Sequence, residues 1–137
     1  MQNLHPNQIA VIIETVRSAR PDTQALYVFG SYANGTTGVM SDIDLALYTS
    51  EPMSSMEVYE LRQELAAQLN QDVDLIDLRE ATHLLCNEVV QKGKRLFQAP
   101  EFDVDRYELQ VISQYLDFQE GTKDLREAIQ KRGFIHG

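Results

Sequence analysis

Two pairs of aspartates in the sequence have the spacing of a metal site. Asp42 and Asp44 lie in the segment DIDLALY, and Asp72 and Asp74 lie in DVDLIDL. Both segments read as β-strands, in which side chains two residues apart point to the same face, so each pair projects together. Two carboxylates at one solvated edge repel each other, and a bound cation is the usual reason for such an arrangement. Oxygen ligands without a nearby histidine or cysteine suit Mg²⁺ or Mn²⁺ rather than zinc.

Asp74 is the third candidate ligand, because it is flanked by the apolar residues Val73 and Leu75. An unpaired carboxylate in the middle of a strand is costly unless it serves a site. Asp77 alternates to the opposite face and is predicted to cap the following helix instead. Three carboxylates from two strands can hold two metal ions about 3.5–4 Å apart, which is the arrangement that supports in-line attack on phosphorus.

A glycine-containing loop precedes the first aspartate pair. Gly30 and Ser31 directly follow the apolar segment 24–29, where a tight turn lets backbone N–H groups and a hydroxyl approach phosphate oxygens. An ordinary turn is the alternative, and the spacing to Asp42 favours phosphate binding. A Ca²⁺ loop is not favoured at the aspartates, because Ala46 stands where an EF-hand needs a further oxygen ligand.

The elements that must position these residues can be read from hydrophobic periodicity and from start and stop signals. Helices are predicted from Pro6 to before Pro21, from the Ser54–Glu57 capping box to Asn70, over residues 80–93 and beyond Pro100; strands are predicted over 24–29, 42–48 and 72–78, with a short edge strand at 94–97. This order predicts an α/β (α+β) domain with a small mixed sheet flanked by helices and followed by a C-terminal helical extension.

Length and charge limit the classes of function. The 137 residues suit one ordinary domain, and the net charge of −9 disfavours a polymeric nucleic acid as substrate. The sequence contains no long apolar run and its first residues do not resemble a signal peptide, so we expect a soluble, cytoplasmic protein that does not bind membranes. Cys86 is expected to be a small buried thiol, and the three histidines are too scattered to form a site. Lys92, Lys94 and Arg95 are expected on a solvated face rather than on a phosphate.

The only plausible internal boundary is at Pro100, which gives a domain over 1–99 and a helical tail over 100–137 that packs on this domain or on a partner. Apolar residues follow one helical face of the tail, which we expect to be interrupted by Gly121 and closed by Gly133. They are Val104, Tyr107, Val111, Tyr115, Phe118, Leu125 and Ile129, and the stripe is widened by Leu109, Ile112 and Leu116. This surface could be core or a self-association surface, and its width favours docking of a protein partner.

The motifs together resemble a known family. Gly30-Ser31, ten residues and then Asp42-Ile43-Asp44 match the GS-x10-DxD signature of the DNA polymerase β-like nucleotidyltransferase superfamily. The fuller segment GSYANGTTGVMSDIDL resembles its smallest branch, the minimal nucleotidyltransferase or MNT domains, and the later segment 73–78 fits the same pattern. The tail resembles that of MNT antitoxins, which pair with HEPN-domain ribonuclease toxins.

The resemblance implies a polymerase β-like fold in which Asp42, Asp44 and Asp74 are both metal ligands and catalytic residues. It implies that Asp74 is also the base for the attacking hydroxyl. Gly30 and Ser31 would bind the triphosphate of ATP, with Ser41 of the same motif as a further nucleotide-binding residue. The expected cofactor is Mg²⁺, as two ions and with Mn²⁺ as an alternative. The expected reaction is transfer of AMP from ATP to a tyrosine of a HEPN toxin, in a hetero-oligomer with that toxin.

One departure and two alternatives remain. Asn34 stands where many relatives carry arginine, so a phosphate contact from that position is not expected here. The chain could instead be a non-catalytic antitoxin that occludes its partner with the tail. It could also be a small-molecule nucleotidyltransferase of the aminoglycoside-modifying type, although no second domain is present to shape an acceptor pocket. The aspartates favour an enzyme, and the tail favours a protein partner.

Overall fold

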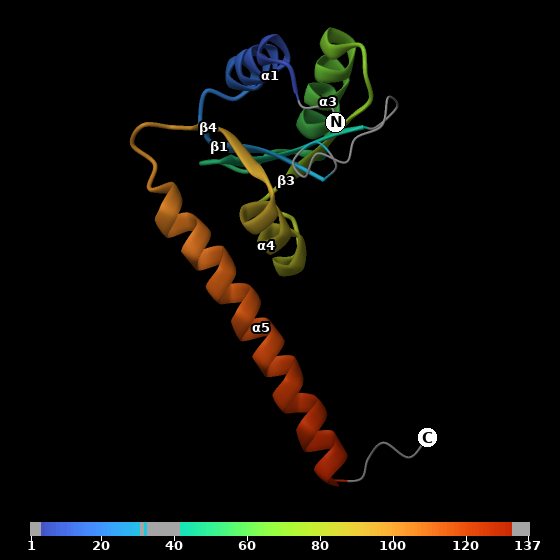
Figure 1. Ribbon diagram of the computed structural model, residues 1–137, viewed down its shortest axis with the longest axis vertical. Coiled ribbons are helices and arrows are strands. Elements are labelled where there is room, and N and C mark those ends of the chain that lie inside the picture. The colour runs from blue at the N-terminus through green and yellow to red at the C-terminus, as the bar shows by residue number, and fades with distance from the viewer. Residues whose placement is uncertain (1–3, 31, 33–41, 133–137) are drawn as a thin grey trace.

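The computed structural model describes residues 4–30, 32 and 42–132, with residues 122–132 described by their backbone alone. Helices cover both faces of one sheet, and a long last helix extends beyond them (Figure 1). In chain order the elements are α1 (Pro6–Ala19), β1 (Thr23–Phe29), β2 (Ile43–Thr49), α3 (Ser55–Leu69), β3 (Val73–Asp77), α4 (His83–Lys92), β4 (Lys94–Gln98) and α5 (Val104–Arg132).

The sheet is mixed and has the strand order β3-β2-β1-β4. Strand β1 pairs antiparallel with both β2 and β4, whereas β2 and β3 are parallel neighbours. The expected edge strand is therefore present as β4, and β3 is the edge on the other side. The parallel pairing places the beginnings of β2 and β3 side by side, and these beginnings carry the two aspartate pairs.

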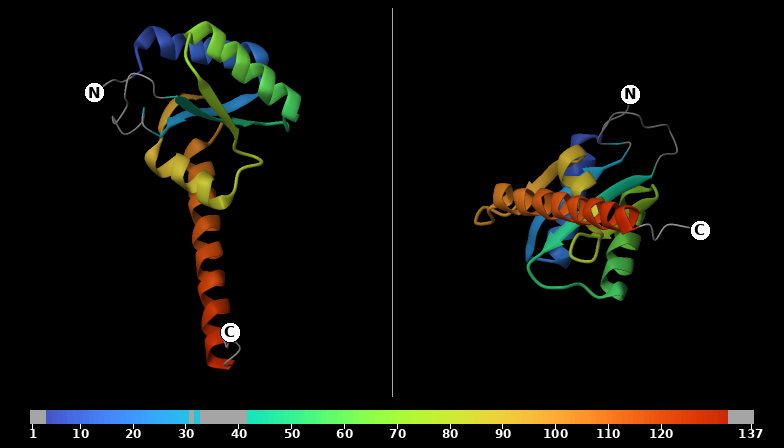
Figure 2. Two further views of the ribbon diagram at one scale, coloured as in Figure 1. Left: turned by 90° about the vertical axis from the view of Figure 1, so that its right-hand side faces the viewer. Right: turned by 90° about the horizontal axis from the view of Figure 1, so that it is seen from below.

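Helices α1 and α3 pack on one face of the sheet (Figures 1 and 2). The core on this side is made of aliphatic side chains from both helices and from alternate strand positions. Its most deeply buried members are Ile12, Val16, Leu26, Ile43, Leu45, Leu47 and Leu65. This alternation fixes the register, because a shift by one residue would turn the apolar set away from the helices.

Local signals at the helix ends agree with the structure. The Ser54 side chain accepts the Glu57 N–H and Glu57 reciprocates at the Ser54 N–H, so the predicted capping box of α3 is confirmed. The same helix ends at Asn70, whose left-handed φ of 52° turns the chain toward β3. Helix α4 begins after its cap Thr82, so the prediction of helix from residue 80 was early. Residues 77–81 form a hydrogen-bonded turn instead, in which Asp77 Oδ1 accepts the Arg79 N–H.

Helix α4 and the first half of α5 cover the opposite face. Tyr27, Ala46, Val89 and Val104 form the buried centre of this second cluster. Cys86 lies at its edge with its thiol 3.4 Å from the Leu78 carbonyl oxygen, so the expected buried thiol is confirmed. A buried thiol of this kind contributes packing rather than reactivity.

Helix α5 is continuous over its 29 residues, so the predicted interruption at Gly121 was wrong. An exposed glycine costs a helix about 1 kcal/mol relative to alanine, which does not end a long helix. Within the described chain no helix, α5 included, is both long and apolar enough to cross a membrane. The left view of Figure 2 shows that the second half of α5 extends away from the sheet.

The apolar stripe of α5 divides between two environments. Val104 and Val111 are buried, with exposures of 4% and 7%, and α5 packs on α4. Leu109, Leu116 and Phe118 are 65%, 57% and 56% exposed. Val111 is therefore core and is not available to a partner, contrary to the expectation of one continuous docking face. Leu109 and Leu116 remain available for one.

Candidate active site

Asp44 and Asp74 are direct partners across the parallel strands β2 and β3. Each is the second residue of its strand, and each is followed and preceded by a side chain of the buried α1–α3 core. Residues opposite each other in a parallel pair point to the same face. The two carboxylates therefore share the face on which Ala46 packs toward α4 and α5.

Asp42 comes immediately before β2 and is exposed, whereas Asp44 is half-buried. Burial raises the pKa of Asp44, and the negative charges of Asp74 and Asp42 raise it further. The three carboxylates thus repel one another at one place in the fold. Such repulsion is relieved by a cation, and it is typical of functional sites rather than of structural ones.

Gly30 directly follows β1 and brings the backbone against Asp44. Its φ is +67°, a left-handed value, and its neighbour Phe29 is the register partner of Asp44. A Cβ atom built on Gly30 would collide with Oδ2 of Asp44. A glycine is therefore required both by the backbone angle and by the carboxylate beside it.

Tyr32 lies two residues after Gly30 and is buried. Its ring is 6% exposed and belongs to the core under α1 and α3. The Gln71 side-chain amide donates a hydrogen bond to the Tyr32 hydroxyl. Since Gln71 lies in the turn before β3, this contact joins Tyr32 to the turn that leads into the strand of Asp74. The sequence offered no signal for this pair, because the contact joins residues far apart in the chain.

Ser31, Ser41 and Asn34 lie outside the described residues, so the expected nucleotide contacts of the two serines stay predictions. Of the predicted nucleotide-binding residues, Gly30 is the one that the structure describes.

Arg62 is a neighbour of Asp74 that the sequence did not reveal. It lies on α3, and its Nη1 is 3.9 Å from Oδ1 of Asp74. Its guanidinium carbon also lies 5.6 Å from the centre of the Tyr59 ring, one turn earlier on the helix. The sequence could not predict this contact, because the position of Arg62 on an amphipathic helix does not indicate which carboxylate of another element it contacts.

The chemistry of the donors fits a hard divalent cation, because carboxylate oxygens are the ligands that Mg²⁺ prefers. Asp42, Asp44 and Asp74 would hold such an ion, and it would supply neutralising charge for phosphate oxygens. Among residues 4–30, 32 and 42–132, no three acidic, histidine or cysteine side chains lie close enough to one another to hold a metal ion.

Other charged residues have partners of their own. Lys92 pairs with Glu88 at 3.3 Å, and Arg95 lies 3.5 Å from Glu108, whose carboxylate also accepts the buried Tyr27 hydroxyl at 2.6 Å. Lys92, Lys94 and Arg95 are all exposed, which confirms their expected position on a solvated face. Tyr27 and Glu108 instead fasten α5 to β1.

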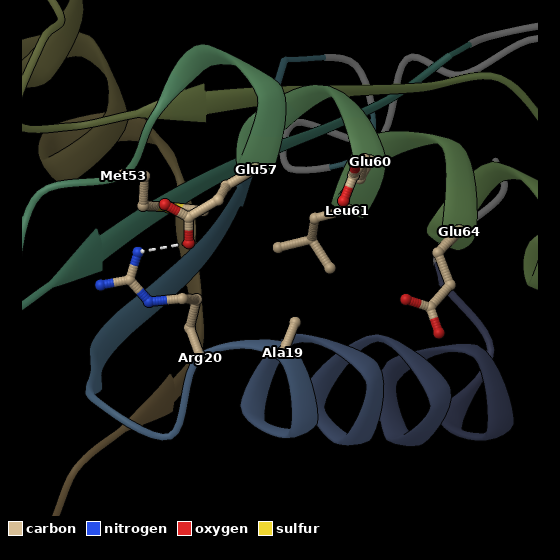
Figure 3. A pocket seen from close by; sticks show the side chains of 7 residues that line it. All are labelled: Ala19, Arg20, Met53, Glu57, Glu60, Leu61 and Glu64. Carbon is tan, nitrogen blue, oxygen red and sulfur yellow. Dashed lines mark hydrogen bonds and ion pairs between the residues drawn. The ribbon is translucent and has the colours of Figure 1, made fainter.

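A separate hollow of about 220 Å³ lies between α1 and α3 (Figure 3). Its polar lining is Arg20, Glu57, Glu60 and Glu64, and it contains none of the three aspartates. The guanidinium of Arg20 is already engaged by Asp22 at 2.8 Å and by Glu57 at 3.2 Å. This hollow therefore does not extend the candidate site.

Comparison with known proteins identifies the family. The model of the family "Polymerase beta, Nucleotidyltransferase" matches residues 11–102, which include Gly30 and all three aspartates. The chain belongs to this nucleotidyltransferase family. Its mixed sheet with helices on both faces is the polymerase β-like fold that the sequence predicted. The match ends before α5, which begins at Val104.

The chain is similar to curated relatives along most of its length. It is 40% identical over 119 residues to the protein adenylyltransferase MntA of Shewanella oneidensis, covering 87% of this chain and 83% of that one. It is 24% identical over 120 residues to the protein adenylyltransferase MntA of Aphanizomenon flos-aquae, with 80% of each chain covered.

Solved structures show the same similarity. One is a toxin-antitoxin with AMP-PNP, with a TM-score of 0.80 and 35% identity, over 93% of this chain and 99% of that one. Another is a tri-AMPylated Shewanella oneidensis HEPN toxin in complex with its MNT antitoxin, with a TM-score of 0.75 and 32% identity, over 90% and 97% of the two chains. The predicted resemblance to MNT antitoxins is confirmed.

Proposed function

We propose that this chain is an antitoxin that transfers AMP from ATP to a tyrosine of a HEPN-type ribonuclease toxin and so neutralises it in the cytoplasm. The similarity to protein adenylyltransferases supports this reaction, and the similarity to a complex that contains an AMPylated HEPN toxin supports this partner. The observation within the chain that carries the proposal is the alignment of Asp44 with Asp74, beside Asp42 and against Gly30.

In the proposed reaction, the tyrosine oxygen forms a bond to the α-phosphorus of ATP. The bond from that phosphorus to the bridging oxygen breaks, pyrophosphate leaves, and the hydroxyl proton passes to Asp74. Asp42, Asp44 and Asp74 would hold the divalent cations, for which we propose two Mg²⁺ ions, and these would neutralise charge on the phosphate oxygens. Asp74 suits the base because it lies on the edge strand and is exposed, where an acceptor can approach.

Gly30, Ser31 and Ser41 are the proposed nucleotide-binding residues. Gly30 supports this role through its left-handed backbone next to Asp44, since a chain without a Cβ at that point lets a phosphate approach both the amide and the carboxylate-bound cation. AMP-PNP in a similar toxin-antitoxin structure supports ATP as the substrate.

Helix α5 is the proposed docking segment, and residues 1–99 the proposed catalytic domain. Leu109 and Leu116 are two helical turns apart, lie on one side of α5 and are more than half exposed. Large exposed apolar side chains of this kind mark protein interfaces when they are contiguous. The same exposed helix supports the second candidate function, neutralisation by occlusion without catalysis.

The decisive experiment is the intact mass of the toxin after incubation with this chain, ATP and Mg²⁺. We expect the toxin to gain one or more adenylyl groups. The reaction should fail with Asp42→Asn/Asp44→Asn or in excess EDTA. A toxin whose mass does not change, although it binds this chain and is neutralised by it, would favour occlusion. Adenylyl transfer that persists in EDTA would overturn the metal mechanism.

A further inference from the structure

Arg62 reaches the candidate site from the opposite face of the sheet. It belongs to α3, which packs on the face of Ile43 and Leu45, whereas Asp74 shares the other face with Asp44. The contact is possible because β3 is an edge strand, so a long side chain can pass around it. The guanidinium thereby approaches the strand edge at which Asp74 is exposed.

The three carboxylates differ in their pairing with basic side chains. Asp74 has an ion pair with Arg62, whereas in the described part of the chain neither Asp42 nor Asp44 has a basic partner within 4.0 Å. Tyr59 lies beneath the guanidinium and favours this position of the arginine through a cation–π contact. Asp74 therefore has a basic partner on α3, although its negative charge still repels that of Asp44.

We propose that Arg62 is a positioning residue that competes with the divalent cation for the Asp74 carboxylate. With no cation bound, Arg62 holds Asp74 on the α3 side. When a cation is bound by the aspartates, Asp74 leaves Arg62 to join them. This inference rests on the proposed metal-binding role of the three aspartates and adds a residue that the family signature does not contain.

The expected effect is modest, because the two side chains are 38% and 53% exposed. Exposed ion pairs are weak, so a cation that must break the Arg62–Asp74 pair in order to bind should lose only about two- to five-fold in affinity. Removal of Arg62 should therefore tighten cation binding by about the same factor. A merely structural arginine would leave this affinity unchanged when the fold is intact.

The test is a titration of the whole chain with Mn²⁺ at low salt and without nucleotide. Free Mn²⁺ is measured by its electron paramagnetic resonance signal. We expect Arg62→Gln to bind Mn²⁺ about two- to five-fold more tightly than wild type. Arg62→Lys, which keeps the charge, should stay near wild type. Arg17→Gln is the matched control, because Arg17 stacks on Phe97 and its loss changes the net charge equally.

A double-mutant cycle separates competition between Arg62 and the cation for Asp74 from the long-range electrostatic repulsion of the cation by the Arg62 charge. In an Asp74→Asn background, Arg62→Gln should no longer tighten Mn²⁺ binding. The proposal would be overturned if Arg62→Gln tightened Mn²⁺ binding equally with and without Asp74, or did not tighten it at all. The proposed function would still stand in either case if Mn²⁺ binding depended on Asp42 and Asp44. Absence of Mn²⁺ binding in wild type would overturn both.

Discussion

Gly30 and Asp44 lie so close that any side chain on residue 30 would strike the Asp44 carboxylate. The absence of a side chain at Gly30 therefore leaves space for the carboxylate of Asp44, which belongs to the same motif. This relationship explains the chemical need for glycine without reference to a bound nucleotide. It also couples the end of β1 to the beginning of β2, because Phe29 and Asp44 are register partners.

Gly30→Ala should reduce both stability and transfer. A left-handed residue with a Cβ costs about 1–2 kcal/mol, and the new methyl group must displace Asp44. A displacement of about 1 Å at a reacting centre costs about 100-fold in rate. Urea unfolding and initial AMP-transfer rates measure the two effects. Gly121→Ala is the control, because a Cβ there meets nothing and should stabilise α5 by up to about 1 kcal/mol.

The two aspartates of β3 should differ in function. Asp74→Ala should slow AMP transfer by about 10²–10⁴-fold, the usual contribution of a general base, while ATP binding is partly retained. Asp77→Ala should transfer AMP near the wild-type rate and lose about 1 kcal/mol of stability, because Asp77 accepts the Arg79 N–H. Single-turnover rates decide between them. Loss of transfer in Asp77→Ala with normal transfer in Asp74→Ala would reverse the assignment.

Sequence patterns predicted the elements that depend on local chemistry. The Ser54–Glu57 capping box marked the start of α3, and the apolar alternation around Asp44 and Asp74 gave the strands. The pairing of these two aspartates could not be predicted, because it depends on the parallel register of strands separated by a helix. Arg62 and the Tyr32–Gln71 contact were missed for the same reason, since each joins residues 12 or more positions apart.

The tail shows a different limit. Periodicity identified an apolar stripe, but it could not show where the packing partner ends. Helix α4 covers α5 at Val111, whereas Phe118, two turns further on the same side, meets the His83 ring at the start of α4 with 6.2 Å between ring centres and is still 56% exposed. Gly121 was read as a break, although a helix of 29 residues carries one exposed glycine at small cost.

Tyr32→Phe should weaken ATP binding more than it slows the chemical step. The Tyr32 hydroxyl accepts from Gln71, and loss of this bond should release Tyr32, two residues after Gly30, from the turn before β3 and cost about 1 kcal/mol of stability. We therefore expect a higher KM for ATP with kcat nearly unchanged. Tyr115→Phe is the control, because Tyr115 also accepts a glutamine amide, from Gln119, but at the exposed surface of α5. Equal KM values for the two variants would refute the coupling.

Stability should fall in acid partly through Asp22. The Arg20 guanidinium, whose Nε donates at 2.8 Å, and the Glu51 N–H lower the pKa of Asp22 to about 2. A carboxyl whose pKa is lower in the folded than in the unfolded state stabilises the fold above its unfolded pKa, and this stabilisation is lost as the pH falls through the folded pKa. Asp22→Asn should cost about 2 kcal/mol at pH 7.

The difference in unfolding free energy between wild type and Asp22→Asn should shrink between pH 4 and about 2. Urea titrations at several pH values measure it. Asp117→Asn, at an exposed position of α5, is the control and should differ little from wild type at any pH. A constant difference across this range would show that Asp22 acts through packing and not through its charge.

The outer side of α5 should decide whether the toxin is modified or occluded. Leu109→Glu and Leu116→Glu should weaken the complex, because apolar anchors at interfaces contribute about 1–4 kcal/mol each. Met56→Glu is the matched control, since Met56 is 63% exposed but lies on α3. Val111→Glu is unsuitable because Val111 is buried and its replacement would disturb the fold. Calorimetric affinities for the toxin measure the effect.

Docking variants and metal-site variants should then fail in opposite ways. The α5 variants should modify the toxin slowly because the acceptor is no longer held beside Asp74, whereas Asp42→Asn/Asp44→Asn should bind the toxin normally and leave it unmodified. Growth of cells that co-express toxin and variant separates the two functions. If Asp42→Asn/Asp44→Asn protects cells as well as wild type, occlusion through α5 is sufficient. If protection is lost while pull-down recovers the intact complex, neutralisation requires AMP transfer, and α5 acts by bringing the acceptor to the aspartates.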